Sequence, residues 1–127
     1  MDPKVSISID VAEMEKAFLF YSEALGCKEV RHGDDITVLS ADNATIYLLK
    51  KEPGTNPLLS GAATRNYQRP WTPVHLDFVV ANIDETLALI IENGGSHEGS
   101  ESGDWGSIAY CSDPFGNGFC LVVMGEQ

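Results

Sequence analysis

From Val5 to Val11, apolar and polar side chains alternate strictly. Such alternation is typical of a β-strand with one buried face. From Met14 to Leu25 the apolar residues instead recur every three or four positions, which predicts an amphipathic helix that ends at Gly26. Three short strands are predicted next, over residues 27–31, 36–40 and 44–50, so this half of the chain is expected to form a βαβββ module.

The same order of elements returns in the second half. Residues 11–15, Val-Ala-Glu-Met-Glu, correspond to residues 80–84, Val-Ala-Asn-Ile-Asp, at the start of a second predicted helix. The second copy predicts a strand over 74–80, a helix over 83–92, a stop at Gly94-Gly95, and strands over 96–101, 107–111 and 118–124. We therefore expect a single domain over residues 1–127, made of module one (1–50), a Pro- and Gly-rich linker (51–72) and module two (73–127).

The predicted fold class is α+β. Two βαβββ modules would form curled mixed sheets around a concave cup, with the helices on the outer face. Strand alternation then assigns the residues that line the cup. Through the repeat, Ser6 corresponds to His75 and Tyr47 corresponds to Cys120, while Asp77 shares the face of His75.

Composition and charge narrow the possible partners. The 127 residues are 43% hydrophobic and 21% charged, which suits a globular domain. The three cysteines lack the spacing of metal fingers or secreted disulfides, and no export signal or membrane-spanning stretch is recognised, so a cytoplasmic location is expected. A net charge of −11 argues against nucleic acid and membrane partners, because both need a positive protein surface.

Four motifs together resemble the vicinal oxygen chelate superfamily, which includes glyoxalase I, bleomycin resistance proteins and extradiol dioxygenases. They are Phe20-Tyr21 with Leu25-Gly26, His75-Leu76-Asp77-Phe78-Val79-Val80, Gly94-Gly95, and Asp113-Pro114-Phe115-Gly116-Asn117. The resemblance covers nearly the whole chain. It implies paired βαβββ modules, a homodimer and a small-molecule ligand.

The resemblance also implies where a metal would bind. Metal-dependent members carry a ligand, commonly His or Glu, on the first and last strands of both modules. Those positions hold Ser6, Tyr47, His75 and Cys120, of which only His75 is a standard match. We therefore expect no cofactor. The alternative is a divalent metal at His75, held with the Cys120 thiolate and helped by Asp77. Cys120 could instead be a nucleophile or a small packing residue, and packing is the preferred interpretation.

Other candidate ligand contacts come from the linker and a late turn. Arg69 and Trp71 belong to a segment that could close over the cup and hold an anionic or aromatic ligand, although an ordinary surface loop is the preferred interpretation. Trp105 lies on a predicted turn, where it could line the mouth of a pocket or plug the end of a barrel.

Two functions of different kinds fit these features. The first is a non-catalytic protein similar to the bleomycin resistance proteins, which would bind a cationic or aromatic small molecule without metal. The second is a glyoxalase-type lyase or isomerase that uses His75 as a base or metal ligand. The missing metal ligands favour the binding protein, and the sequence leaves open whether the chain is an enzyme.

Overall fold

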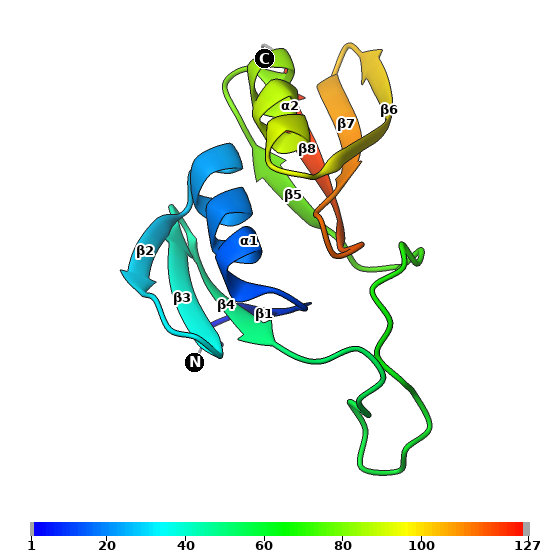
Figure 1. Cartoon of the computed structure of the whole chain (residues 1–127). Helices are drawn as coiled ribbons and strands as arrows, with labels where there is room; N and C mark the ends of the chain where they lie inside the picture. Colours follow the sequence, from blue (N-terminus) through cyan, green and yellow to red (C-terminus); the bar gives the residue numbers. More distant parts are fainter. Residues whose placement is uncertain (1, 126–127) are drawn as a thin grey trace.

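The computed structural model describes residues 2–125, which form two four-stranded mixed sheets and two main helices (Figure 1). The strand order is β1-β4-β3-β2 in the first sheet and β5-β8-β7-β6 in the second. In each sheet the strand that precedes the helix pairs in parallel with the last strand of its module. The remaining pairs are antiparallel. The prediction of an α+β fold with two βαβββ modules is confirmed.

The bounds of the elements are close to the predicted ones. They are β1 (Ser6–Val11), α1 (Met14–Leu19), a π-helical segment η1 (Phe20–Ala24), β2 (Lys28–Arg31), β3 (Ile36–Ala41), β4 (Ala44–Lys50), β5 (Leu76–Val79), α2 (Ile83–Glu92), β6 (Ser96–Gly103), β7 (Gly106–Ser112) and β8 (Gly118–Met124). Within residues 2–125, no helix is both long enough and apolar enough to cross a membrane.

The ends of the helices follow from local chemistry. The side-chain oxygen of Asn82 accepts the backbone N–H of Glu85 at 3.0 Å, which caps the start of α2. Gly26 and Gly94 follow the two helices with φ of 76° and 92°, a conformation that favours glycine. Gly95 is needed for space instead, because a Cβ there would lie 2.7 Å from side-chain atoms of both Ile90 and Phe20.

The first helix departs from the predicted pattern. After Leu19 it widens into η1, and both Phe20 and Tyr21 are almost fully buried. Phe18, one of the apolar residues of the predicted helical pattern, is only half-buried, and its ring centroid lies 4.2 Å from that of His32. The reason is that this helix packs on both sheets, so a single apolar stripe does not suffice.

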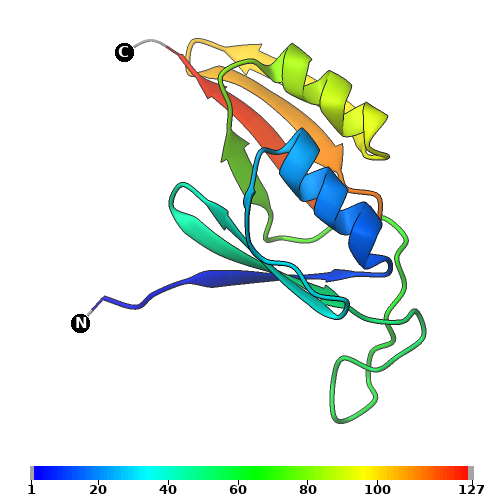
Figure 2. The same ribbon diagram turned by 60° about the vertical axis from the view of Figure 1, so that its left-hand side comes forward.

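One hydrophobic core serves both modules. Figure 2 shows the two helices next to each other on the same side of the molecule. Phe20 of η1 contacts Phe119 of β8, with ring centroids 5.9 Å apart, and the buried Ile90 of α2 belongs to the same core. Within the described residues the sheets do not close into a barrel. The faces of the two sheets that lie away from the helices are therefore left open.

Candidate functional site

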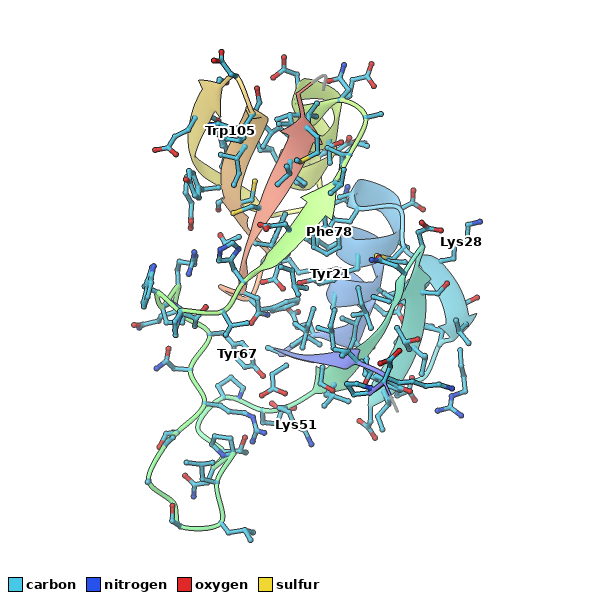
Figure 3. The ribbon with its side chains drawn as sticks, turned by 180° about the vertical axis from the view of Figure 1, so that it is seen from behind. Tyr21, Lys28, Lys51, Tyr67, Phe78 and Trp105 are labelled. Atoms are coloured by element: carbon cyan, nitrogen blue, oxygen red, sulfur yellow. The ribbon has the colours of Figure 1, made fainter. Side chains whose placement is uncertain are left out.

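The predicted lining residues lie in two separate places. Ser6 and Tyr47 border a hollow on the first sheet. His75 borders a groove of about 400 Å³ at the junction of the modules, together with Asp10 and Asn117. Figure 3 shows Tyr21 and Phe78 at this junction. Within one chain, Ser6 and Tyr47 thus lie apart from His75.

The directions of β1 and β5 explain this separation. Ile7, near the start of β1, borders the same hollow as Val79 at the end of β5, and it also borders the groove that contains His75. Asp10, near the end of β1, borders the same groove as His75 at the start of β5. The two strands therefore run in opposite directions along the junction, which places Ser6 and His75 at opposite ends.

Three of the predicted residues do come together on the open side of the second sheet. The Nδ1 atom of His75 lies 3.2 Å from Oδ1 of Asp77. Asp77 pairs in register with Cys120 of β8, and the possible donor atoms of His75, Asp77 and Cys120 all lie within 4.8 Å of one another. We call these three residues the His75 cluster. The contact uses Nδ1, so Nε2 of His75 takes no part in it.

Cys120 is buried although it belongs to an open sheet face. Its neighbours across the sheet are Asp77 on β5 and Tyr110 on β7, and its own side chain is short. Burial, and then the nearby Asp77 carboxylate, raises the pKa of the Cys120 thiol to about 11. The thiol is therefore protonated at neutral pH, which suits a packing or donor role better than that of a nucleophile.

The rest of this face divides into a polar end and an apolar end. Next to Cys120, the Tyr110 hydroxyl donates to Oε2 of Glu101 at 2.9 Å, and this hydrogen bond raises the pKa of Tyr110. One step further along the strands, Val79, Val122 and Ile108 stand side by side. We call the surface formed by the His75 cluster, the Tyr110–Glu101 pair, these three apolar residues and Met124 the open face.

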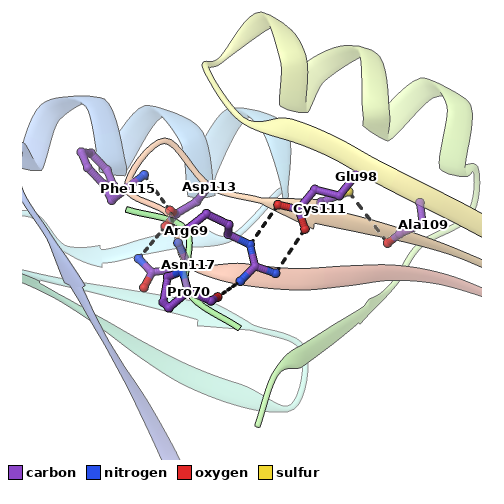
Figure 4. Close-up of polar contacts among 8 residues, drawn as sticks. All are labelled: Arg69, Pro70, Glu98, Ala109, Cys111, Asp113, Phe115 and Asn117. Carbon is purple, nitrogen blue, oxygen red and sulfur yellow. Dashed lines mark hydrogen bonds and ion pairs between the residues drawn. The ribbon is translucent and has the colours of Figure 1, made fainter. Parts of the chain in front are cut away.

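Arg69 holds the linker across the second sheet (Figure 4). Its Nε and Nη2 atoms donate to the two carboxylate oxygens of Glu98 at 2.9 and 3.2 Å, and its Nη1 donates to the carbonyl of Pro70. A Cβ at Gly118 would overlap the guanidinium, so glycine at this position lets Arg69 lie flat on β8. A ligand would therefore meet a matched ion pair here, not a free cation.

The two tryptophans lie at different margins. Trp71 is 81% exposed, on the linker just beyond the Arg69 anchor. Trp105 is half exposed at the turn between β6 and β7, and its carbonyl accepts the N–H of Gly125 at 2.7 Å (Figure 3). This places Trp105 at the end of the sheet that carries Met124, beside the apolar part of the open face.

A buried carboxylate fixes the turn that leads into β8. Oδ1 of Asp113 accepts the backbone N–H groups of Phe115 and Asn117 at 2.8 and 2.9 Å (Figure 4). Its Oδ2 accepts the Asn117 side-chain amide at 2.9 Å and the hydroxyl of Tyr21 at 2.7 Å. Since Tyr21 belongs to module one, this network joins the modules and sets the position of the strand that carries Cys120.

Three residues of the site were missed by the sequence analysis: Tyr110, Glu98 and Glu101. Tyr110 could have been found, because it alternates with the apolar Ala109 and Cys111 of a predicted strand. Glu98 could not, because the ladder between β6 and β7 shifts register between His97 and Gly99.

Comparison with known families gives a match over most of the chain. Residues 6–122 match the profile of the glyoxalase-like domain family. Comparison with curated proteins gives no match.

Solved structures share the fold at low sequence identity. The fosfomycin resistance protein FosX from Listeria monocytogenes superposes with a TM-score of 0.73 at 15% identity, over 97% of this chain and 93% of that one. A glyoxalase/bleomycin resistance protein from Albidiferax ferrireducens gives 0.67 at 20% identity, over 93% and 95%. Lactoylglutathione lyase from Agrobacterium tumefaciens gives 0.63 at 14% identity, over 96% and 94%. At these identities the likeness concerns the fold alone.

Proposed function

The chain belongs to the glyoxalase-like domain family of the vicinal oxygen chelate superfamily, and from this premise we propose that it binds a small organic molecule on the open face without requiring a metal. The observation that carries the proposal is the exposed His75–Asp77 pair, which lies beside a protonated thiol on the face that also exposes Val79 and Met124. Binding sites of this kind use a few polar groups to orient the ligand and apolar surface to hold its body.

The charges of the open face narrow the ligand class. Arg69 is neutralised by Glu98, so the carboxylates of Asp77 and Glu101 are the main charges of the open face. A carboxylate-rich surface beside apolar side chains favours a neutral or cationic molecule with an aromatic or aliphatic body. The strong negative charge of the whole chain acts in the same direction.

We propose further that two copies pair as a homodimer. Ser6 and Tyr47 lie on the open side of the first sheet, at the other end of the junction from the His75 cluster. A second copy could face its first sheet toward this open face and so bring Ser6 and Tyr47 to the ligand. The uncovered faces of both sheets support such pairing.

A cytoplasmic location remains part of the proposal. It is supported by Cys27, Cys111 and Cys120, which are buried and free within the described residues, as expected for a reducing compartment.

A metal-dependent lyase or isomerase is the second candidate. His75, Asp77 and Cys120 offer nitrogen, oxygen and sulfur donors close together, a set that fits a borderline soft ion such as Zn²⁺. When bound, such an ion would polarise a substrate oxygen, and His75 would be one of the residues that hold it. Binding of the ion by Cys120 would release the thiol proton, so the affinity for the metal would rise with pH.

A binding screen tests the proposal. Aromatic cations, neutral aromatics and aromatic anions would be compared by thermal shift and calorimetry, first with a chelator and then with Zn²⁺. We expect binding with the chelator present, and we expect His75→Ala or Asp77→Asn to weaken it by at least about tenfold. His97→Gln is the matched control. His97 pairs in register with the core residue Cys111, so it lies on the side of the sheet opposite the open face.

Two outcomes would count against metal-free binding on this face. One is a ligand that binds with equal affinity to the wild type, His75→Ala and Asp77→Asn. The other is a stoichiometric Zn²⁺ ion that survives purification and is lost in His75→Ala, which would select the metal-dependent candidate instead.

A further inference from the structure

The linker carries a projecting loop that takes no part in the proposed ligand site of its own chain. Residues 54–65 leave the body and return to it, and Figures 1 and 2 show them pointing away from both sheets. The two ends of the loop are tied together, because Gly54 N–H donates to the Arg65 carbonyl and Arg65 N–H donates to the Thr55 carbonyl, each at 2.8 Å. We call residues 54–65 the arm.

The base of the arm is fixed to module one. Nε of Arg65 donates to Oδ2 of Asp10 on β1 at 2.9 Å, and Nη1 donates to the hydroxyl of Thr55 at 3.2 Å. The Arg65 side chain is only 17% exposed, and the nearby Tyr67 hydroxyl donates to the Lys51 carbonyl at 2.6 Å. A base held in this way lowers the entropy that the arm would lose when it docks.

The tip of the arm is apolar and lies in solvent. Leu59 is fully exposed and Leu58 is 52% exposed. From Pro53 to Thr64 the sequence has no charged residue, although the chain as a whole carries a net charge of −11. Two adjacent leucines held away from the core do not stabilise the fold of their own chain, and such exposed apolar groups mark interaction sites.

The charge distribution favours a second copy as the partner. Two copies of an acidic chain repel each other, so a stable contact between them requires surface without charge, and residues 54–64 of the arm provide eleven uncharged residues in a row. A basic partner would instead be attracted to the acidic surfaces. The open face offers uncovered apolar side chains to receive the arm, since Val79 is 69% and Met124 is 56% exposed.

We infer that the arm of one copy docks on the open face of a second copy and closes the ligand site of that partner with Leu58 and Leu59. The inference rests on the proposed function only for the identity of the site that is closed. It predicts that the arm contributes both to dimer stability and to the affinity of the partner's ligand site.

Sedimentation analysis of the full chain tests the assembly. The wild type is expected to be a dimer, and Leu58→Asp/Leu59→Asp is expected to weaken dimerisation by at least about tenfold, because two charges would enter an apolar contact between acidic chains. The control Leu19→Asp/Ile91→Asp also replaces two exposed apolar residues, which are 48% and 59% exposed but lie on the helices, away from the arm, the open face and the first sheet. This control should dimerise like the wild type. Circular dichroism would establish that all three proteins are folded.

Disulfide cross-linking tests where the arm docks. Chains carrying Leu59→Cys would be mixed with chains carrying Val79→Cys under mild oxidation, with Leu59→Cys and Ile91→Cys as the control mixture, since Ile91 is exposed on α2. A cross-linked product specific to the first mixture is expected. A wild type that remains monomeric, an arm variant that dimerises as tightly as the wild type, or equal cross-linking in both mixtures would overturn the inference. Loss of ligand binding in His75→Ala is a separate result, so failure of the ligand site and failure of the arm can be told apart.

Discussion

Replacing Asp113 by alanine is expected to lower the free energy of unfolding by about 3–5 kcal/mol. The carboxylate is almost fully buried and accepts four hydrogen bonds, two of them from the backbone of its own turn. A third comes from Tyr21 of the other module. Removing the carboxylate leaves buried donors without partners, which costs more free energy than the hydrogen bonds themselves contributed. Urea unfolding followed by fluorescence and circular dichroism measures the effect.

Two milder variants separate the contributions of the network. Asp113→Asn keeps an acceptor for the backbone N–H groups and should cost about half as much as alanine. Tyr21→Phe removes one hydrogen bond to a charged group and should cost about 1.5–3 kcal/mol. If the two residues act together, the double variant Tyr21→Phe/Asp113→Ala should cost less than the sum of the single variants. An Asp113→Ala protein within about 1 kcal/mol of the wild type would contradict this account of the network.

Stability is expected to fall as the pH rises above about 8.5, where unfolded thiols begin to ionise. Burial raises the pKa of Cys111 to about 12, and burial also raises the pKa values of Cys27 and Tyr21. Between the unfolded and folded pKa values the folded chain keeps protons that the unfolded chain has lost. The stabilising contribution is therefore complete below the unfolded pKa and disappears as the pH approaches the folded one. The urea midpoint at about pH 7.5 and about pH 10 measures the loss.

A cysteine variant isolates the thiol contribution from the titration of surface lysines. Cys111→Ala removes the group with the most strongly raised thiol pKa, and its midpoint should fall less between the two pH values than that of the wild type. Equal losses in both proteins would show that Cys111 does not carry the effect.

The module architecture could be predicted because it depends on local periodicity. The alternation of Val5, Ile7 and Ile9, followed by helical spacing from Met14, leads directly to the first strand and helix, and the repeat carries the same assignment to module two. The change to η1 at Phe20 could not be predicted, because it depends on the second sheet that packs against the same helix.

The candidate site was predictable within a sheet but not between sheets. Alternation and register place Asp77 beside Cys120, as the structure has them. Alternation fixes the face on which a residue lies, but it carries no information on the direction of β1 relative to β5, so the separation of Ser6 from His75 had no signal in the sequence. The ion pair between Arg69 and Glu98 depends on a register shift in β6 and on the path of the linker, both of which are tertiary features.

The most direct test of ligand binding on the open face is an NMR titration of the chain with the tightest compound from the binding screen. The account predicts that the ligand causes the largest chemical-shift changes at Asp77, Tyr110, Cys120 and Val122, and that His75→Ala reduces these changes. A compound that binds while the signals of these residues remain unchanged would contradict the assignment of the ligand site to the open face.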